Sequence, residues 1–287
     1  MKTFNTYNFS NFMVMNEFYL SALYIYPIKS LGGISLNQAE IEEKGLKYDR
    51  RWMLIDQEGT FVSQRKHHSL ALLQVNIDDE IVNIVHKNDT QIQASFTIGE
   101  QTGTPINVTI WDDQSRGTEV STKVSRWFSD FLGMEVKLVE MPEEEKRQVD
   151  PKYAKNEETV SFADGYPCLL IGQSALDGLN EKLEQAIAMD RFRPNLVFTG
   201  GAAHIEDTFF SFDIGNVQFT AVKPCARCVL ITVDQQTGVK GAEPLKTLAG
   251  YRTRNKKIMF GQNLLHSAPG TLRVGDQLVI KDWKPAV

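Results

Sequence analysis

Cysteine is scarce in this sequence, with three residues among 287, at positions 168, 225 and 228. A small and odd number of cysteines cannot build the disulfide framework of a small secreted protein. We therefore expect free thiols in a reducing compartment, which places the protein in the cytoplasm. Long apolar runs are missing as well. No stretch approaches the ~18 consecutive apolar residues that mark a membrane span, so we expect no such span.

An excess of positive charge is also absent. Lys and Arg number 31 against 36 Asp and Glu, which gives a net charge of −5. Non-specific binding to nucleic acid depends on excess Lys and Arg, so we expect no nucleic-acid partner. The sequence also lacks a phosphate-binding P-loop, a dinucleotide-binding glycine fingerprint and a Ser-His-Asp order, which argues against nucleotide-dependent and serine-hydrolase chemistry.

Short strands dominate what is present. Between residues 19 and 119, apolar or alternating segments such as RWMLID and QIQASFTI are separated by turn residues, and Glu58-Gly59 marks a hairpin. Strand patterns resume at NLVFTG and include CVLITVD at 228–234. Three modest helices are predicted, at 122–132, at about 174–187 and near PLKTLAGYR. The predicted fold class is mostly β (α+β), with few short helices and with barrels or strongly curved sheets in place of alternating βαβ units.

Two segments lack apolar periodicity. Residues 143–158 (EEEKRQVDPKYAKNEE) are dense in charge, which indicates a solvated loop, or alternatively a mobile lid beside a site. Residues 1–15 precede the first clear strand pattern. We expect them to be disordered or to lie before the true start of the protein.

The most specific local motif is C-A-R-C at 225–228, followed by the run VLITVD. A zinc site needs further Cys or His at ligand spacing, and a thioredoxin-type pair opens a helix, whereas this pair leads into a β-branched run. We therefore expect thiols at the head of a strand, beside the cations Lys223 and Arg227. Such a thiol suits a soft metal or sulfur transfer. The alternative is a small buried hydrophobic residue, which is our interpretation of Cys168.

Several cations stand beside turn or hydrogen-bonding residues, namely Lys29-Ser30, Arg50-Arg51, Arg65 and Arg191-Phe192-Arg193. Arg and Lys side chains bind phosphate, and Pro194 restricts the backbone after Arg193, so an anion pocket is one interpretation. Unrelated surface salt bridges are the other. The segment FGQN at 260–263 offers either amides for a heterocycle edge or a turn at a strand end.

Taken together, these segments resemble one family. LYIYPIKSLGGISLNQAEIEEKGLKYDRRWMLIDQEGTFVSQR is similar to the N-terminal β-barrel module of MOSC proteins. RFRPNLVFTGG, KPCARCVLITVDQQTG, EPLKTLAGYR, FGQNL and GTLRVGDQLVI are similar to the MOSC domain itself. The order holds over nearly the whole chain and is most similar to the mitochondrial amidoxime-reducing component and its bacterial relatives. The resemblance implies an extension at 1–15, a β-rich N-terminal MOSC β-barrel module at 16–120 and a MOSC β-barrel domain at 121–287.

The resemblance also implies a molybdenum cofactor (Mo-molybdopterin) and the residues that bind it. Cys228 would be the thiolate that ligates molybdenum, and Cys225 only its neighbour. The positions that match residues around the pterin and its phosphate are Lys29, Ser30, Arg50, Arg193 and Asn195. A further matching set comprises Asp164, Gly165, Tyr166 and Arg227. Relatives often have Ser at position 226 and a small residue at position 166, so any hydrogen bond from those side chains is lost here.

The implied function is that of an oxidoreductase that removes oxygen from N-hydroxylated small molecules, such as hydroxylamines and amidoximes, at molybdenum. No cysteine follows Cys228, so we expect electrons from a separate donor protein, which could be a ferredoxin, a flavoprotein or a b-type cytochrome system. Two alternatives stay open. One is a sulfur or cofactor carrier with a persulfide on Cys228 or Cys225, and the other is a cofactor-binding module without activity.

Overall fold

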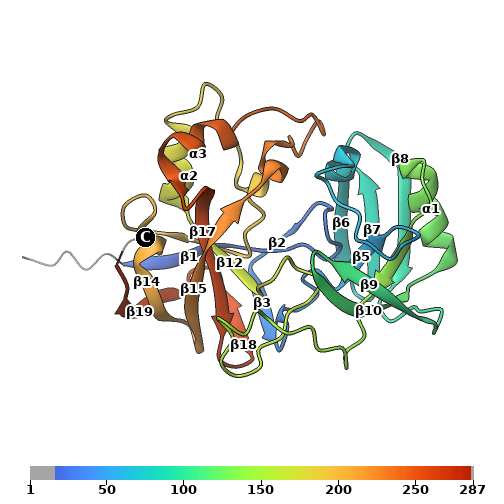
Figure 1. Cartoon of the computed structure of the whole chain (residues 1–287), viewed down its shortest axis with the longest axis horizontal. Coiled ribbons are helices and arrows are strands. Elements are labelled where there is room, and N and C mark those ends of the chain that lie inside the picture. Colours follow the sequence, from blue (N-terminus) through green and yellow to red (C-terminus); the bar gives the residue numbers. More distant parts are fainter. Residues whose placement is uncertain (1–16, 286–287) are drawn as a thin grey trace, which may run out of the picture.

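The computed structural model describes residues 17–285 and consists of two strand-rich lobes (Figure 1). On the left of Figure 1, barrel strands lie beside helices α2 and α3, and on the right, smaller sheets lie beside helix α1. This confirms the prediction of a mostly β fold with few helices. Within residues 17–285, no helix is long and apolar enough to cross a membrane.

Seven strands close into a barrel in the order β12, β13, β1, β19, β14, β15, β17, because β17 also pairs with β12. Their bounds are β1 (Phe18–Ile25), β12 (Cys168–Gly172), β13 (Leu196–Thr199), β14 (Phe209–Ile214), β15 (Val217–Arg227), β17 (Lys257–His266) and β19 (Gln277–Trp283). Only β12 and β13 run parallel within this barrel. Two short strands extend it, β2 (Ile34–Leu36) beside β1 and β16 (Thr253–Arg254) beside β17.

Large apolar side chains fill the barrel at alternating strand positions. In β14, for example, Phe212 and Ile214 are buried whereas Asp213 between them is partly exposed. The N-terminal strand β1 pairs with β13 and β19 and adds Leu20 and Leu23 to the same core. The barrel therefore needs the first strand of the chain as well as the C-terminal strands.

The second lobe combines several small sheets. A four-stranded sheet has the order β5 (Trp52–Ile55), β11 (Lys137–Glu140), β10 (Asp113–Glu119), β9 (Pro105–Ile110). A meander has the order β6 (Leu73–Asp78), β7 (Ile81–His86), β8 (Asp89–Thr97). Trp52, Phe96 and Phe128 belong to the core of this second lobe. A third small sheet, β18 (Gly270–Arg273), β3 (Gln38–Glu42) and β4 (Gly45–Leu46), packs instead on the barrel core, to which Ile41, Leu46 and Leu272 belong.

The helix predictions are confirmed at two places and corrected at one. α1 (Thr122–Leu132) has the predicted bounds and ends at Gly133, whose φ is 66°. α3 (Leu245–Arg252) is also found where it was predicted. α2 (Gln173–Asn180) is shorter than the predicted helix at 174–187. It ends early because the Asn180 side chain bonds both the N–H and the C=O of Ile187, at 2.9 and 3.1 Å, which folds the following residues back.

The predicted strand CVLITVD is wrong. β15 ends at Arg227, and the short 3₁₀ helix η4 (Val229–Thr232) follows. The hydroxyl of Thr232 donates to the Val229 carbonyl at 2.7 Å, a local hydrogen bond that competes with a strand ladder. Cys228 therefore follows the end of a strand and does not stand at the head of one. The other 3₁₀ helices are η1 (His68–Leu72), η2 (Met189–Arg191) and η3 (Ile205–Thr208).

The division of the chain between residues 120 and 121 stays a prediction. Helix α1 and strand β11 follow that point but pack in the second lobe, whereas β1 precedes it and belongs to the barrel. The expectation for residues 1–15 lies outside the described residues.

Candidate functional site

A cavity of about 280 Å³ is lined by residues of both lobes. It brings together every position that the resemblance assigns to a cofactor: Lys29, Ser30, Arg50, Asp164, Gly165, Tyr166, Arg193, Asn195, Arg227 and Cys228. Cys225, Arg65, Lys223 and Asn263 line it as well. Residues that are far apart in the sequence thus share one site.

Positive charge dominates the cavity lining although the whole chain is acidic. The lining cations are Lys29, Arg50, Arg65, Arg193, Lys223, Arg227 and Lys257. Asp164 is the one carboxylate among the lining residues of the described chain. Such a surplus of one sign in a concave site favours an anionic ligand.

Two arginines share one buried aromatic ring at this cavity. The guanidinium carbons of Arg50 and Arg193 lie 4.4 and 4.2 Å from the ring centroid of Tyr26. Asp49 pairs with Arg50 at 2.6 Å, and Asn195 accepts a hydrogen bond from Arg50 at 3.1 Å. The Asn195 amide also accepts a hydrogen bond from the Leu169 N–H and donates one to the Tyr24 carbonyl, so its hydrogen bonds are made within the protein.

Arg193 has a donor without an acceptor in the protein. Its Nη1 donates to the Leu31 carbonyl at 2.7 Å, but its buried Nη2 has no hydrogen-bond partner within the described residues. Burial, and next the nearby Arg50, lower the pKa of Arg193 to about 10. The φ angles of Arg50 and Arg193 are also positive, at 50° and 53°, a backbone strain that often marks ligand sites. A buried guanidinium with an unused donor needs an anion to complete it.

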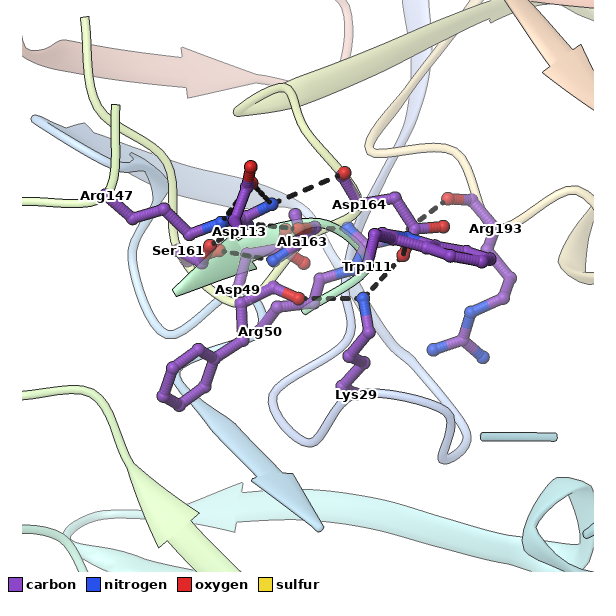
Figure 2. Close-up of polar contacts among 11 residues, drawn as sticks. Lys29, Asp49, Arg50, Trp111, Asp113, Arg147, Ser161, Ala163, Asp164 and Arg193 are labelled. Atoms are coloured by element: carbon purple, nitrogen blue, oxygen red, sulfur yellow. Dashed lines mark hydrogen bonds and ion pairs between the residues drawn. The ribbon is translucent and has the colours of Figure 1, made fainter. Parts of the chain in front are cut away.

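Figure 2 shows how Lys29 is held at the same cavity. The Nζ of this buried residue donates to the Phe162 carbonyl at 2.8 Å and to Asp164 at 2.5 Å. Trp111 donates its indole N–H to the same Asp164 oxygen at 3.2 Å. Burial lowers the pKa of Lys29 to about 8, against the opposing effect of Asp164. Although burial opposes it, the Lys29 ammonium holds the pKa of Asp164 below its usual range.

Trp111 is a site residue that the sequence analysis missed. It lies at the turn between β9 and β10 with a φ of 58°, and the Arg65 guanidinium carbon lies 3.8 Å from its ring centroid. Phe61, on the cavity wall, lies under both Arg65 and Lys29. No local sequence signal marks this turn, because its role depends on Asp164 from a distant segment.

The segment 143–158 is anchored, so the expectation of a solvated loop is wrong for part of it. Arg147 is 4% exposed and bonds Asp113 through Nε and Nη2, at 2.9 and 2.6 Å (Figure 2). Its Nη1 donates to the carbonyls of Ser161 and Ala163. Arg147 therefore ties the β9–β10 hairpin to the segment that carries Asp164.

The two cysteines of the C-A-R-C motif have different surroundings. Cys225 packs partly against a core cluster and accepts a hydrogen bond from Arg227 Nη1 at 3.0 Å, whereas Cys228 is exposed. Arg227 also donates to the Phe192 carbonyl at 2.6 Å. The cation expected beside the pair thus contacts Cys225, as residues two apart on one strand share a face. Cys228 is left as the accessible thiol of the cavity, and Cys168 is buried as expected.

The segment FGQN presents one amide side chain to the cavity, whereas the heterocycle interpretation needed two. Asn263 lines the cavity, but Gln262 is fully buried and donates to Asp207 at 2.8 Å. Gly261, with a φ of 84°, makes its close approach to the Leu170 carbonyl of β12, so a protein strand and not a ligand requires the glycine.

Comparison with known families gives a match over both lobes. A family model described as the MOSC N-terminal beta barrel domain matches residues 17–135, and one described as the MOSC domain matches residues 157–279. The chain belongs to the MOSC family. This confirms the resemblance stated from the sequence.

The MOSC relatives include proteins of similar length. Mitochondrial amidoxime-reducing component 1 of Mus musculus is 31% identical over 279 residues, 91% of this chain and 82% of the mouse protein. Mitochondrial amidoxime reducing component 2 of Homo sapiens is 30% identical over 276 residues, 90% of this chain and 82% of the human protein. Molybdenum cofactor sulfurase of Oryza sativa subsp. japonica is 28% identical over 281 residues, 91% of this chain but 34% of the rice protein.

The MOSC cavity does not resemble a metal site built from protein side chains alone. Among residues 17–285, no three His, Cys, Asp or Glu residues are grouped so that they could hold a metal ion. The donor set of the cavity is instead two thiols that solvent reaches, of which Cys228 is the more exposed, with many cations. It suits a group that brings its own negative charge and further ligands for any metal it carries.

We predict that Arg147→Ala lowers the free energy of unfolding by about 2–4 kcal/mol, because it leaves two buried carbonyls and one face of Asp113 without partners. Urea denaturation followed by tryptophan fluorescence measures this loss. Arg116→Ala is the matched control, since Arg116 pairs with Glu145 while 60% exposed, and should cost less than about 1 kcal/mol. Equal losses in the two variants would contradict the anchoring role.

Proposed function

We propose that this MOSC protein is a molybdenum-cofactor-dependent oxidoreductase that reduces N-hydroxylated compounds such as hydroxylamines and amidoximes. The observation that carries the proposal is the accessible thiol of Cys228 in a cavity with seven cations. The names of the mouse and human relatives, which describe amidoxime reduction, support the reaction class. The name of the rice relative supports the cofactor.

The cavity fits a pterin cofactor that carries a phosphate. The unpartnered Nη2 of Arg193 is a buried donor aimed at no protein atom in the described chain, which is what a phosphate oxygen would satisfy. Arg50 and Lys29 would add charge beside it, and Ser30 a short polar side chain. Asn195 would act through Arg50, whose guanidinium it positions.

The protein would offer the metal one ligand, the thiolate of Cys228. Cys225 is turned toward the core cluster and Arg227, which leaves Cys228 free to face the ligand. When bound, the cofactor would supply the two-electron oxygen-transfer chemistry at its metal. The chain's residues bind and orient it, and the buried Arg50–Arg193 pair keeps the anionic end in a fixed place.

Two positions depart from the family pattern, and both lie at the cavity. Ala226 has no hydroxyl, so only its backbone can contact a ligand there. Tyr166 introduces a ring that packs edge to face on Tyr153, with centroids 5.9 Å apart. We therefore propose that Ala226 and Tyr166 change the shape of the cavity wall that the substrate contacts. Cys228 and the arginines would still bind the cofactor.

We propose that electrons reach the site from a separate donor protein, a ferredoxin, a flavoprotein or a b-type cytochrome system. Cys228 and Val229 are both exposed, so a donor could approach close to the thiol. The three free cysteines fit a reducing compartment, and the cytoplasmic location is part of this proposal.

A sulfur or cofactor carrier is the second candidate. It is favoured by the exposed Cys228 and by a second thiol that Arg227 contacts, since two nearby thiols can hold and resolve a persulfide. Turnover of a hydroxylamine by the loaded protein separates the two candidates, because a carrier would transfer sulfur without reducing it.

We predict that Cys228→Ser abolishes hydroxylamine reduction and alters the electron paramagnetic resonance signal of the bound metal. Cys225→Ser is the matched control and should keep the signal, because Cys225 faces the protein core and Arg227. Reduction is measured with reduced methyl viologen as electron source. An essential Cys225 with a dispensable Cys228 would overturn the ligand assignment.

We predict that Arg193→Ala weakens cofactor retention at least about tenfold, since a charge-assisted hydrogen bond is worth about 1.5–3 kcal/mol. The measurement is molybdenum and pterin content after gel filtration. Arg191→Ala serves as control, because Arg191 pairs with Asp234 at 2.6 Å and does not line the cavity. Full occupancy in the Arg193 variant would refute the phosphate role.

A further inference from the structure

Lys223 is a cavity cation whose N–H donors are unused. Its ammonium lies 5.0 Å from the ring centroid of Tyr153 and 5.7 Å from that of Tyr166. Neither a hydrogen bond nor an ion pair links its side chain to any other described residue in 17–285. Aromatic faces hold a cation by electrostatic attraction but accept none of its charge, so its three N–H groups are left for a ligand.

Three of the other cavity cations differ in this respect, whereas Arg65 and Lys257 also make no side-chain hydrogen bond or ion pair within the described residues. Lys29 is paired with Asp164, Arg50 with Asp49, and Arg227 donates to the Phe192 carbonyl. The charges of Lys29 and Arg50 are partly neutralised by these carboxylates, and Arg227 uses a donor on the protein backbone. Lys223 keeps its full charge at the cavity wall.

The tyrosine pair beneath Lys223 is built from two segments. Tyr166 lines the cavity, and Tyr153 supports it from the segment 143–158, which Arg147 anchors. Val149 of the same segment is 2% exposed and packs in a small core with Ala163. The position of Lys223 is therefore preorganised by packing, which reduces the entropy cost of ligand binding.

Lys223 also lies on the strand that leads to the thiol. It lies on β15, five residues before Cys228, and is half-exposed at the cavity wall, whereas the unpartnered donor of Arg193 is buried. A cofactor stays bound in the enclosed part, but a substrate must enter and leave at each turnover. A cation that solvent reaches in the same cavity as the thiol is placed to contact the substrate.

We propose that Lys223, held on the Tyr153–Tyr166 pair, binds an anionic group of the substrate, so that carboxylate-bearing N-hydroxylated compounds are preferred over neutral ones. This specificity site rests on the reductase function proposed above. Lys223 is a binding residue here and takes no part in the chemical step.

The test compares 4-carboxybenzhydroxamic acid with benzhydroxamic acid, with reduced methyl viologen as electron source. Each hydroxamic acid takes up two electrons and two protons and leaves as the amide and water. Lys223→Met should raise KM for the carboxylated compound about tenfold or more, as expected for loss of a charge-assisted hydrogen bond, and change KM for the neutral one less than about twofold. Lys223→Arg should restore the preference.

Lys257→Met is the matched control, because it removes the same charge from an exposed lysine that lines the same cavity. It should leave the ratio of the two KM values unchanged. Equal effects of Lys223→Met on both compounds would overturn the proposal. So would loss of molybdenum from that variant, since Lys223 would then hold the cofactor.

Binding of the products separates this proposal from the proposed function. Calorimetry on the cofactor-loaded protein compares 4-carbamoylbenzoate with benzamide and needs no turnover. Lys223-dependent binding of the anion without reduction of either hydroxamic acid would retain the anion site and reject the reductase. Reduction of both compounds with no Lys223-dependent binding would retain the reductase and reject the anion site.

Discussion

The structure depends on a buried surplus of positive charge. Arg50 and Arg193 share the ring of Tyr26, and Asp49 pairs with only one of them. Burying a like-charged pair is costly unless a counter-charge completes it. The protein fixes the two guanidinium groups with carbonyl and amide acceptors but leaves Nη2 of Arg193 unpartnered within the described residues. An anionic ligand would thus satisfy this donor and offset the buried charge.

The chain topology explains how both lobes contribute to this charge. Strand β1 lies in the barrel, and the segment between β1 and β5 carries Lys29, Ser30 and Arg50 to the cavity that residues of both lobes line. Arg147 and Asp113 then fix the segment before β12, which holds Asp164 against Lys29. Pairing of β15 with β17 up to Arg227 fixes where the chain leaves the barrel, directly before Cys228. The cavity is consequently set by packing between lobes and not by one loop.

Much of the fold and part of the candidate site could be predicted from the sequence. Helix α1 and its end at Gly133 follow from apolar periodicity and a left-handed glycine, which are local signals. The residues alone suggested an anion pocket as one interpretation of the cavity cations, but only the family pattern indicated that they converge, because no local signal shows that residues distant in sequence meet. Two errors came from local bonds between a side chain and the backbone, since Asn180 shortens α2 and Thr232 turns the predicted strand into η4. A third came from tertiary contacts, since Arg147 buries part of a charged segment. Trp111 was missed because its partner, Asp164, comes from elsewhere in the chain.

The central claim is that the cationic cavity and the thiol of Cys228 hold a molybdenum cofactor. The most direct test is molybdenum analysis by inductively coupled plasma mass spectrometry, with oxidised-pterin fluorescence on the same sample, after expression in a host that makes the cofactor. The account predicts close to one molybdenum and one pterin per chain. Folded protein from such a host with neither metal nor pterin would contradict it and would favour a persulfide on Cys228.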